Sequence, residues 1–538
     1  MAWLHTWCGV VIGSLLFVIF WMGSLSVFDK EIDLWMIPGL RTATVAASPP
    51  AGAHVKLDGP ITDTAQTLAK GSPNWFVRLP SERLNAVELR WRGKGEMNER
   101  RYLNPDTGKV LPQTDTLGGT GFIFPFHFRL HLKWLDLGYW LVGLAGMAML
   151  VMVVSGVVIH RKIFADFFLF RPRKQMQRAS LDLHNLMGVV AMPFHFVVAL
   201  SGMVILFATY FPSSYQTAYA QAKDARQAFN AEAYGQFRRP AAKQPGELAS
   251  LDAMVTQAEQ HWGSSRANFV RVWHPGDANS YVEIRRGYED RVTMAVDMAY
   301  FDGASGQLLK RFEGAPVVTA QRFVSGLHFV QFDHWTLRWL YFAAGLSGCV
   351  MIATGFLFWL ASRRASHARK GMAGVRVVEA LTAFSVTGTI TATLAFFIAN
   401  RLLGADASLA GVDRSELEVW IFHMVWLTTL GHAALRQRAV WAEQCATIAV
   451  AAVLAVMLNS ITTGDHPVRS LMTGQWAVLG MDSLLLVSAG LAAWTARHLR
   501  HKGLATQLSK LPRPHQPVTT APPRTTSATS TAKVTLHV

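Results

Sequence analysis

Long apolar runs alternate with polar stretches along the chain, and this alternation predicts a polytopic α-helical membrane protein. A helix needs roughly 20 mostly apolar residues to cross the hydrocarbon core of a bilayer. Eight segments have about that length and composition: 4–27, 137–160, 184–208, 338–361, 377–400, 418–436, 440–460 and 474–496. The first has no basic N-terminal region and no A-x-A cleavage site, so we expect a retained span and not a cleaved signal peptide.

Basic residues gather in alternate loops between these spans. The loop 161–178 holds six lysines and arginines against one acid, and the loop that follows the fourth span holds five and no acid. The positive-inside rule places such loops in the cytoplasm, together with both termini. The long segments 29–125 and 211–330 then lie on the opposite side. The net charge of +16 therefore reflects topology, and we expect no nucleic-acid partner.

Composition supports the lipid bilayer as the environment of the chain. Only 16% of its residues are charged and 51% are hydrophobic, whereas soluble domains have about 25% charged residues. The three cysteines, Cys8, Cys349 and Cys445, each lie in an apolar run, and the chain has no C-x-x-C-H motif. The cysteines thus argue against iron–sulfur clusters and a covalently attached c-type haem.

The two long polar segments combine strand-like alternation with turn signals, which predicts a small α+β domain in each. Strands are expected near 76–79, 87–91, 269–273 and 281–284, and a polar helix near 247–261. The tail 503–538 is rich in Pro, Ser and Thr, so we expect disorder there.

The first two thirds of the chain consist of one unit written twice, 1–162 and 180–364. Leu-His opens the first and third spans, at His5 and His184, and a glycine follows each histidine after four and again after eighteen residues. A turn with Gly108 precedes His131 by 23 residues, and a turn with Gly306 precedes His328 by 22. Each unit thus runs helix, domain, helix, and a C-terminal block of four helices, 377–497, follows.

The recurrence of the histidines predicts that they are ligands of a metal centre. A single histidine near a helix end is more often an interfacial residue, but recurrence at matching places favours a shared role. His5 and His184 begin spans of one direction and His131 and His328 precede spans of the other, so each pair lies at one depth. Haem iron with two axial imidazoles needs two histidines that face each other. The pattern therefore predicts two b-type haems, one near each face of the membrane.

These features resemble the PepSY-associated transmembrane family over roughly 1–365. The resemblance is carried by LHTWCGVVIG, the DTGKV and ASGQL turns, LHLKWLDLGYWLVG, LDLHNLMGVV and GLHFVQF. The chain departs from the family pattern at Met22-Gly23, where Thr-Gly is common, and by its C-terminal block. The resemblance implies a bacterial inner-membrane location, a periplasmic PepSY-like domain in each unit, and haem bound by His5, His131, His184 and His328.

The resemblance also implies the reduction of ferric siderophores, or of other ferric chelates, at the periplasmic face. One electron converts Fe³⁺ to Fe²⁺, which the hard oxygen ligands of a chelate hold far less well. We expect electrons from quinol or a cytoplasmic donor, because the chain has no dinucleotide-binding fingerprint. No catalytic side chain is assigned, since electron transfer needs none.

Five further histidines are second-rank ligand candidates: His127, His160, His195, His334 and His423. The two haem layers should be separated by most of a core about 30 Å thick. His195 is expected between them, 11 residues after His184 on nearly the same face of one helix and about 16 Å further outward. Leu16 occupies its matching place in the first unit. A buried histidine bonded to a carbonyl is an equally good interpretation of His195. The matching places of His160, His127 and His334 hold Trp359, Val324 and Leu137.

The C-terminal block has its own polar residues inside predicted spans. His423 and His432 lie nine residues apart, which places them on roughly opposite helix faces and argues against one shared site. Asp482 lies inside the eighth span, where an acid is a functional hypothesis by default. A quinol site or a partner contact competes there with a purely structural helix bundle.

Two other functional classes remain open from the sequence. A permease for a siderophore, haem or metal predicts spans broken by Gly or Pro at mid-membrane, and Pro193 is the one strong interruption. A non-enzymatic regulatory or sensory role of the PepSY domains predicts no histidines at two depths.

Overall fold

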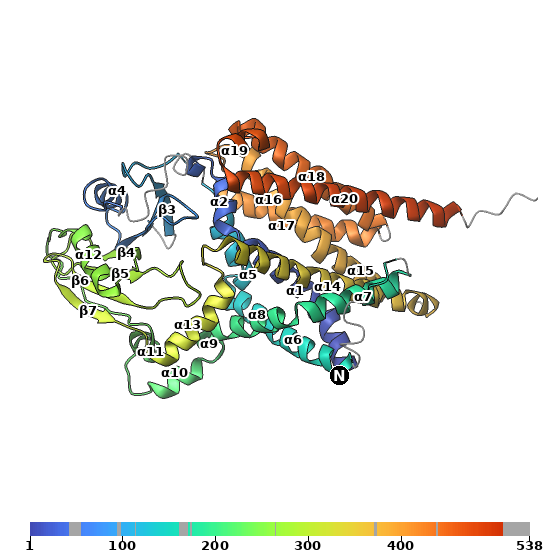
Figure 1. Cartoon of the computed structure of the whole chain (residues 1–538), viewed down its shortest axis with the longest axis horizontal. Coiled ribbons are helices and arrows are strands. Elements are labelled where there is room, and N and C mark those ends of the chain that lie inside the picture. Colours follow the sequence, from blue (N-terminus) through green and yellow to red (C-terminus); the bar gives the residue numbers. More distant parts are fainter. Residues whose placement is uncertain are drawn as a thin grey trace, which may run out of the picture.

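The computed structural model describes residues 1–41, 55–93, 98–112, 115–160, 170–172, 175–263, 265–370, 374–436 and 439–508. Within these ranges, six helical stretches are long and apolar enough to cross a membrane, and a bent pair of helices can form a seventh span. The six stretches are Ala2–Ser26, Trp134–Ile159, Trp335–Arg364, Gly374–Leu402, Val440–Thr463 and Trp476–His501. The chain is a mostly helical membrane protein with a separate antiparallel sheet (Figure 1).

The third predicted span is broken. Helices α7 (Met176–Val190) and α8 (Met192–Ile205) meet at an angle of 65°. Pro193 lies in the first turn of α8, and its ring clashes with the preceding turn and prevents one continuous helix. His184 and His195 therefore belong to different helices, and the expectation that both lie on one face of a straight helix is wrong.

The sixth predicted segment, 418–436, forms most of helix α17 (Arg414–Arg436). This helix is not among the stretches apolar enough to cross a membrane alone. It packs against α16 and α15 inside the C-terminal block, so neighbouring helices cover much of its polar side.

The spans of the two repeats form one bundle. Helix α1 (Ala2–Ser26) packs against α6 (Leu137–Ile159) of its own unit and against α14 (Trp335–Arg369) of the second unit. Helix α14 also packs along α7, and α6 packs along α8. The first helix of one unit and the last helix of the other thus lie side by side at the centre of the bundle.

The two outer domains share a single sheet of seven antiparallel strands, where separate domains were expected. The strands are β1 (Asn74–Arg78), β2 (Val87–Arg92), β3 (Asn98–Leu103), β4 (Ala267–Trp273), β5 (Tyr281–Arg286), β6 (Met298–Asp302) and β7 (Leu308–Phe312). Their order is β3-β2-β1-β4-β5-β6-β7, so β1 of the first unit pairs with β4 of the second. Helices α4 (Pro60–Leu68) and α12 (Leu251–Trp262) cover one face and bury its aliphatic side chains (Figure 1).

Short helices connect the sheet to the bundle. They are α2 (Asp29–Met36), the π-helical turn Gly119–Ile123, α5 (Phe124–Arg129), α9 (Phe207–Tyr210), α10 (Pro212–Ala218), α11 (Ala225–Ala233) and α13 (Pro316–Phe329). Helices α5 and α13 occupy corresponding places in the two units, each directly before a membrane span. Both end in a residue with a left-handed backbone, Leu130 and Val330.

The C-terminal block contains α15 (Gly374–Ala383), the π-helical turn Phe384–Gly388, α16 (Thr389–Leu402), α17, α18 (Val440–Thr463), α19 (Pro467–Met472) and α20 (Trp476–Leu508). Helix α2 packs against α20. Helix α20 continues to Leu508, so residues 503–508 are helical where disorder was expected. The rest of the predicted disordered tail, 509–538, lies outside the described residues.

Candidate functional site

The inner candidate site is a cavity of about 620 Å³ between α1, α6, α7 and α14. His5 from α1 and His184 from α7 both line it, and their ring centres lie 6.2 Å apart with the ring planes at 86°. His160, Arg178 and Arg363 also line this cavity. The structure thus brings together the two histidines that the repeat predicts as the inner pair.

Both inner rings are held by a helix of the same unit. The Nδ1 atom of His5 lies 3.1 Å from the Met152 carbonyl and 3.1 Å from Ser155 Oγ, and that of His184 lies 2.8 Å from the Met351 carbonyl. Nδ1–H donates to these carbonyls, which leaves a lone pair on Nε2. Neither Nε2 has a hydrogen-bond partner among the described residues. Such a bond from the second ring nitrogen is typical of histidines that ligate metals.

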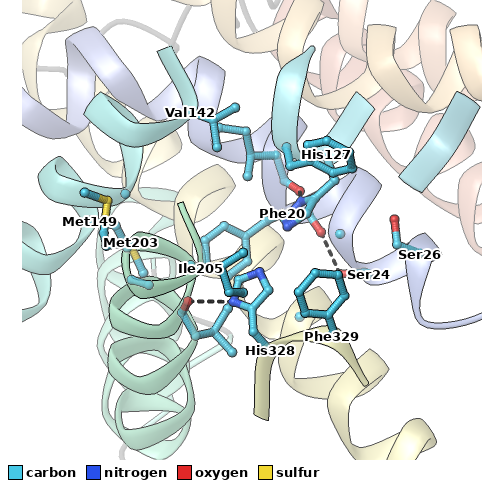
Figure 2. A pocket seen from close by; sticks show the side chains of 18 of the residues that line it. Phe20, Ser24, Ser26, His127, Val142, Met149, Met203, Ile205, His328 and Phe329 are labelled. Atoms are coloured by element: carbon cyan, nitrogen blue, oxygen red, sulfur yellow. Dashed lines mark hydrogen bonds between the residues drawn. The ribbon is translucent and has the colours of Figure 1, made fainter. Parts of the chain in front are cut away.

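The outer candidate site is a cavity of about 320 Å³ that His127 and His328 line together (Figure 2). Their ring centres lie 5.8 Å apart, with the planes at 34°. His127 Nδ1 lies 2.9 Å from the Ile19 carbonyl, and His328 Nδ1 lies 2.9 Å from the Val198 carbonyl and 3.2 Å from Ser201 Oγ. As in the inner site, each Nε2 is free of hydrogen bonds to described residues.

The structure corrects the predicted outer pair, because His328 faces His127 and not His131. The two hydrogen-bond partners, Ile19 and Val198, each lie fourteen residues after the first histidine of their unit. His127 and His328 are therefore equivalent in the repeat, and the alignment of His131 with His328 was wrong by four residues. The misalignment arose because residues were counted from the turn glycines, and the connections between these glycines and the histidines differ in length. The repeated dipeptide His-Phe, at 127–128 and 328–329, is the signal that identifies the true match.

A glycine lies against each of the four rings. A Cβ on Gly23 would lie 2.7 Å from His127, and one on Gly202 would lie 3.1 Å from His328. At the inner site, Cβ atoms on Gly156 and Gly355 would lie 3.3 Å from His5 and 3.1 Å from His184. Every ring thus has the same surroundings, a glycine on one helix and a carbonyl that accepts from Nδ1. The Met22-Gly23 departure from the family's Thr-Gly leaves the glycine in place.

The ring separations fit two imidazoles on one metal ion. Two metal–nitrogen bonds of about 2 Å, with each ring centre about 1 Å behind its nitrogen, place the centres about 6 Å apart. The observed values are 6.2 Å and 5.8 Å. No group of three or more His, Cys, Asp or Glu in the described chain could hold a metal ion. A metal held by only two side chains needs other ligands, and a porphyrin supplies four nitrogens.

The two cavities lie directly next to each other. Leu16 of α1 and Met149 of α6 line both of them, so one layer of side chains separates the inner cavity from the outer one. The histidines of the two sites stand far apart along α1, since His5 and Gly23 are separated by eighteen residues, or about 27 Å of helix. The cavities extend into that interval.

The second-rank histidines have different surroundings. His160 lines the inner cavity, and His334 accepts a hydrogen bond from the Leu337 N–H in the first turn of α14. His195 is fully buried, and its Nε2 lies 3.4 Å from the Ala344 carbonyl and from Ser347 Oγ. It lines neither cavity, which favours a histidine bonded to a carbonyl over a ligand.

His131 and His423 form a third neighbouring pair, with ring centres 6.4 Å apart among Phe122 and other aromatic rings. His423 Nδ1 bonds the Val419 carbonyl of its own helix, whereas His131 Nδ1 is buried with no hydrogen-bond partner in the described chain. Neither residue lines the two cavities described above, and His432 instead contacts Glu443.

Buried ion pairs fix the outer end of α1 beside the outer cavity. Arg83 contacts Asp29 at 3.0 Å and Glu31 at 2.7 Å, and Arg338 of α14 contacts Glu31 at 2.7 Å. Both arginines also donate to the carbonyl of Val27, which lines the cavity. Burial opposes the ionisation of Glu31, but Arg83 and Arg338 together outweigh it and hold the pKa of Glu31 below its ordinary value.

Asp482 is completely buried and bonded by two neighbours. It accepts from Trp35 Nε1 at 2.8 Å and lies 3.4 Å from Asn459 Nδ2. Trp35 belongs to α2, so this contact attaches the first repeat to the C-terminal block. The geometry favours the structural interpretation of Asp482 over a quinol site.

The comparisons with known proteins agree with this architecture. The profile of the PepSY-associated TM region matches residues 2–362. An uncharacterized protein of Pseudomonas aeruginosa is 28% identical over 375 residues, which is 65% of this chain and 88% of that protein. The residues that the profile matches cover nearly all of both repeats, include the four paired histidines His5, His127, His184 and His328, and end before the C-terminal block. The chain belongs to the family of membrane proteins that carry the PepSY-associated transmembrane region.

Proposed function

We propose that this protein is a b-type haem protein of a bacterial inner membrane that passes electrons outward to a ferric chelate. The observation that supports it best is the pair of two-histidine sites at the two ends of α1. Both pairs have the ring separation expected for one metal ion, and all four rings have the same glycine and carbonyl surroundings. Haem bound at each pair supplies a one-electron carrier, and the protein sets its potential through ligands and burial.

The side chains around each pair fix the ligands in position. The carbonyls of Met152, Met351, Ile19 and Val198 select the tautomer with a free Nε2. The walls of both cavities are mostly apolar. Arg178, Arg363 and His160 lie at the inner cavity, where they can neutralise carboxylate groups of a bound macrocycle. Quinol or a cytoplasmic donor would deliver electrons on this side.

The outer site lies at the end of the helix bundle that is joined to the sheet. Under the positive-inside topology, this is the side from which a chelate would arrive. One electron per ferric ion gives Fe²⁺, which leaves oxygen ligands readily. We therefore place the substrate, a ferric siderophore or another ferric chelate, in the periplasm between the sheet and α13.

A visible spectrum of the purified full-length protein, produced with adequate haem, tests the proposal. We expect a b-type Soret band that shifts on reduction and two haems per chain. Adding a ferric chelate to the reduced protein should restore the oxidised spectrum and deliver Fe²⁺ to a ferrous-iron indicator. Protein without a Soret band, or a reduced band that no ferric chelate restores to the oxidised form, would refute the proposal.

The break at Pro193 favours one alternative, a permease. Transporters place substrate sites at broken helices near the middle of the membrane, and α7 and α8 meet there at 65°. A permease predicts that the protein accumulates intact chelate in proteoliposomes without reducing it. Reduction at the membrane surface, with no chelate inside the vesicles, would exclude this alternative.

A further inference from the structure

One face of the sheet carries a second repeated pattern that the haem sites do not use. Phe-Val-Arg occurs at 76–78 in β1 and at 269–271 in β4, and Val-Glu-Leu/Ile-Arg occurs at 87–90 in β2 and at 282–285 in β5. These strands pair so that the motifs form two rows across the sheet. One row is Arg90, Phe76, Arg271 and Glu283, and the other is Glu88, Arg78, Phe269 and Arg285. We call these eight residues the Arg face.

The Arg face lies opposite the helices α4 and α12. The alternate residues Val77, Leu89, Val270 and Ile284 belong to the core under those helices. The Arg face therefore looks toward the membrane bundle (Figure 1), where α13 places Arg322 near Arg285. His328 follows Arg322 on the same helix after six residues, or about 9 Å. The face thus lies next to the outer histidine pair.

Aromatic rings hold the guanidinium groups in fixed orientations. The Arg271 guanidinium lies 4.9 Å from the ring centres of Phe76 and Phe269 and 5.1 Å from that of Trp273. Arg285 lies 4.6 Å from the Phe269 ring centre. Cation–π contacts of this kind order a guanidinium without neutralising its charge.

The face has more positive than negative charge. Glu88 is contacted by Arg90 and by Arg78, and Glu283 by Arg285 and by Arg271. Each carboxylate is thus shared by two arginines, and Arg322 adds a further cation. Glu289, which Asn268 bonds, is a further acid beside these arginines, with Tyr288 next to it. Within this set, five guanidinium groups and three carboxylates leave two positive charges. The neighbouring pairs Lys30 with Asp29 and Arg100 with Asp33 add equal charges of each sign.

Without a bound anion, the surplus positive charge destabilises the buried arginines of the Arg face. Burial lowers the pKa of Arg271 and of Arg322, which shows that their charged forms lose hydration. The Nε atoms of these two arginines are buried and have no hydrogen-bond partner in the described chain. Burial also opposes the ionisation of Glu88, but Arg90 and Arg78 bring its pKa down to about 2. Glu88 is therefore fully ionised already and can supply no further negative charge to these arginines.

We infer that the Arg face binds the negatively charged ligand shell of the ferric chelate, so the substrate is an anionic chelate with carboxylate or catecholate oxygens. The inference rests on the proposed function and names its substrate class. Guanidinium groups match such oxygens with two parallel hydrogen bonds. The half-exposed side chains of Arg78 and Arg285, on either side of Phe269, are the accessible donors.

Calorimetry with gallium(III) citrate tests binding separately from reduction, because gallium(III) does not accept the electron. The full-length protein should bind this probe, and added salt should weaken binding. Arg78→Gln and Arg285→Gln should each weaken it about tenfold, the loss expected for one charge-assisted contact. Both variants leave their glutamate with another arginine, so the fold should persist. Arg311→Gln is the matched control, since Arg311 lies on β7 beside His261 of α12, on the opposite face of the sheet.

Absence of gallium(III) citrate binding, or binding that both variants leave unchanged, would overturn the inference. The same conclusion follows if the variants reduce retention on phosphatidylglycerol vesicles instead, because the face would then bind lipid. The reduced protein should also be oxidised faster by ferric citrate, an anion, than by ferrioxamine B, a cation. Equal rates for the two chelates would leave the proposed function in place and remove the charge preference. Failure of both chelates to oxidise the protein would refute the proposed function itself.

Discussion

The substitution Gly23→Ala isolates the outer histidine site without removing a ligand. The new Cβ would lie 2.7 Å from the Cε1 and Nδ1 atoms of the His127 ring, whereas non-bonded carbon atoms settle at about 3.5–4.0 Å. The ring must therefore move by about 1 Å. Its Nδ1 bond to the Ile19 carbonyl, now 2.9 Å, then approaches the limit of a hydrogen bond.

A displacement of about 1 Å exceeds the tolerance of about 0.5 Å for a preorganised ligand. Loss of the supporting hydrogen bond typically lowers metal affinity 10–100-fold. We therefore expect Gly23→Ala protein to lose most haem from the outer site and to keep the inner one. Gly202→Ala should have a smaller effect, because its Cβ would lie 3.1 Å from His328.

The haem-to-protein ratio and a redox titration measure this effect. Gly480→Ala in α20 is the control, since its Cβ would meet nothing within 4 Å and Gly480 lines neither cavity. We expect the control to retain both redox transitions and Gly23→Ala to retain one. Equal haem content and equal midpoint potentials in the two variants would refute the assigned geometry of the outer site.

Three further predictions concern the outer ligand, a buried acid and the C-terminal block. His127→Leu should abolish the outer haem, whereas His131→Leu should leave haem content and spectra intact; the reverse result would restore the pairing predicted from sequence. Burial raises the pKa of Asp33 to about 6, so the folded protein binds this proton more tightly than the unfolded chain. Stability should then fall by at most about 3 kcal/mol as pH rises from about 4 to about 6, and thermal unfolding of Asp33→Asn in detergent should lack this slope. Asp482→Ala leaves Trp35 Nε1 unpaired and should cost about 1–3 kcal/mol in the same assay, with unchanged haem content; a loss of haem would instead link Asp482 to the redox sites.

The helical repeat could be predicted from sequence because helix spacing is regular. His5 and His184 each open a span, with glycines at equal distances, and the structure brings their rings together. The outer pair could not be aligned in the same way. The segment between the turn glycine and the outer histidine contains a π-helical turn in the first unit, Gly119–Ile123, and the helix α13 in the second. Counting residues across such different structures misplaces the match by one helical turn.

Other features depend on contacts between units and leave little local trace. The strands were expected from their alternation, yet the pairing of β1 with β4 joins residues almost 200 positions apart. That pairing creates the Arg face from two motifs that look unremarkable as single strands. The break at α8 was signalled by Pro193, but neither the angle of 65° nor its consequence for His195 follows from the proline alone.

The distance between the two histidine layers has a different meaning in the structure than the sequence implies. The sequence implies most of a hydrocarbon core of about 30 Å between the layers, too far for direct transfer between the histidines. The two cavities that the histidines line, however, share Leu16 and Met149 as a common wall. Under the proposed function, the relevant distance is therefore between the groups bound in the two cavities, which one layer of side chains separates. An intermediate ligand such as His195 is then unnecessary, which agrees with the position of His195 outside the lining of both cavities.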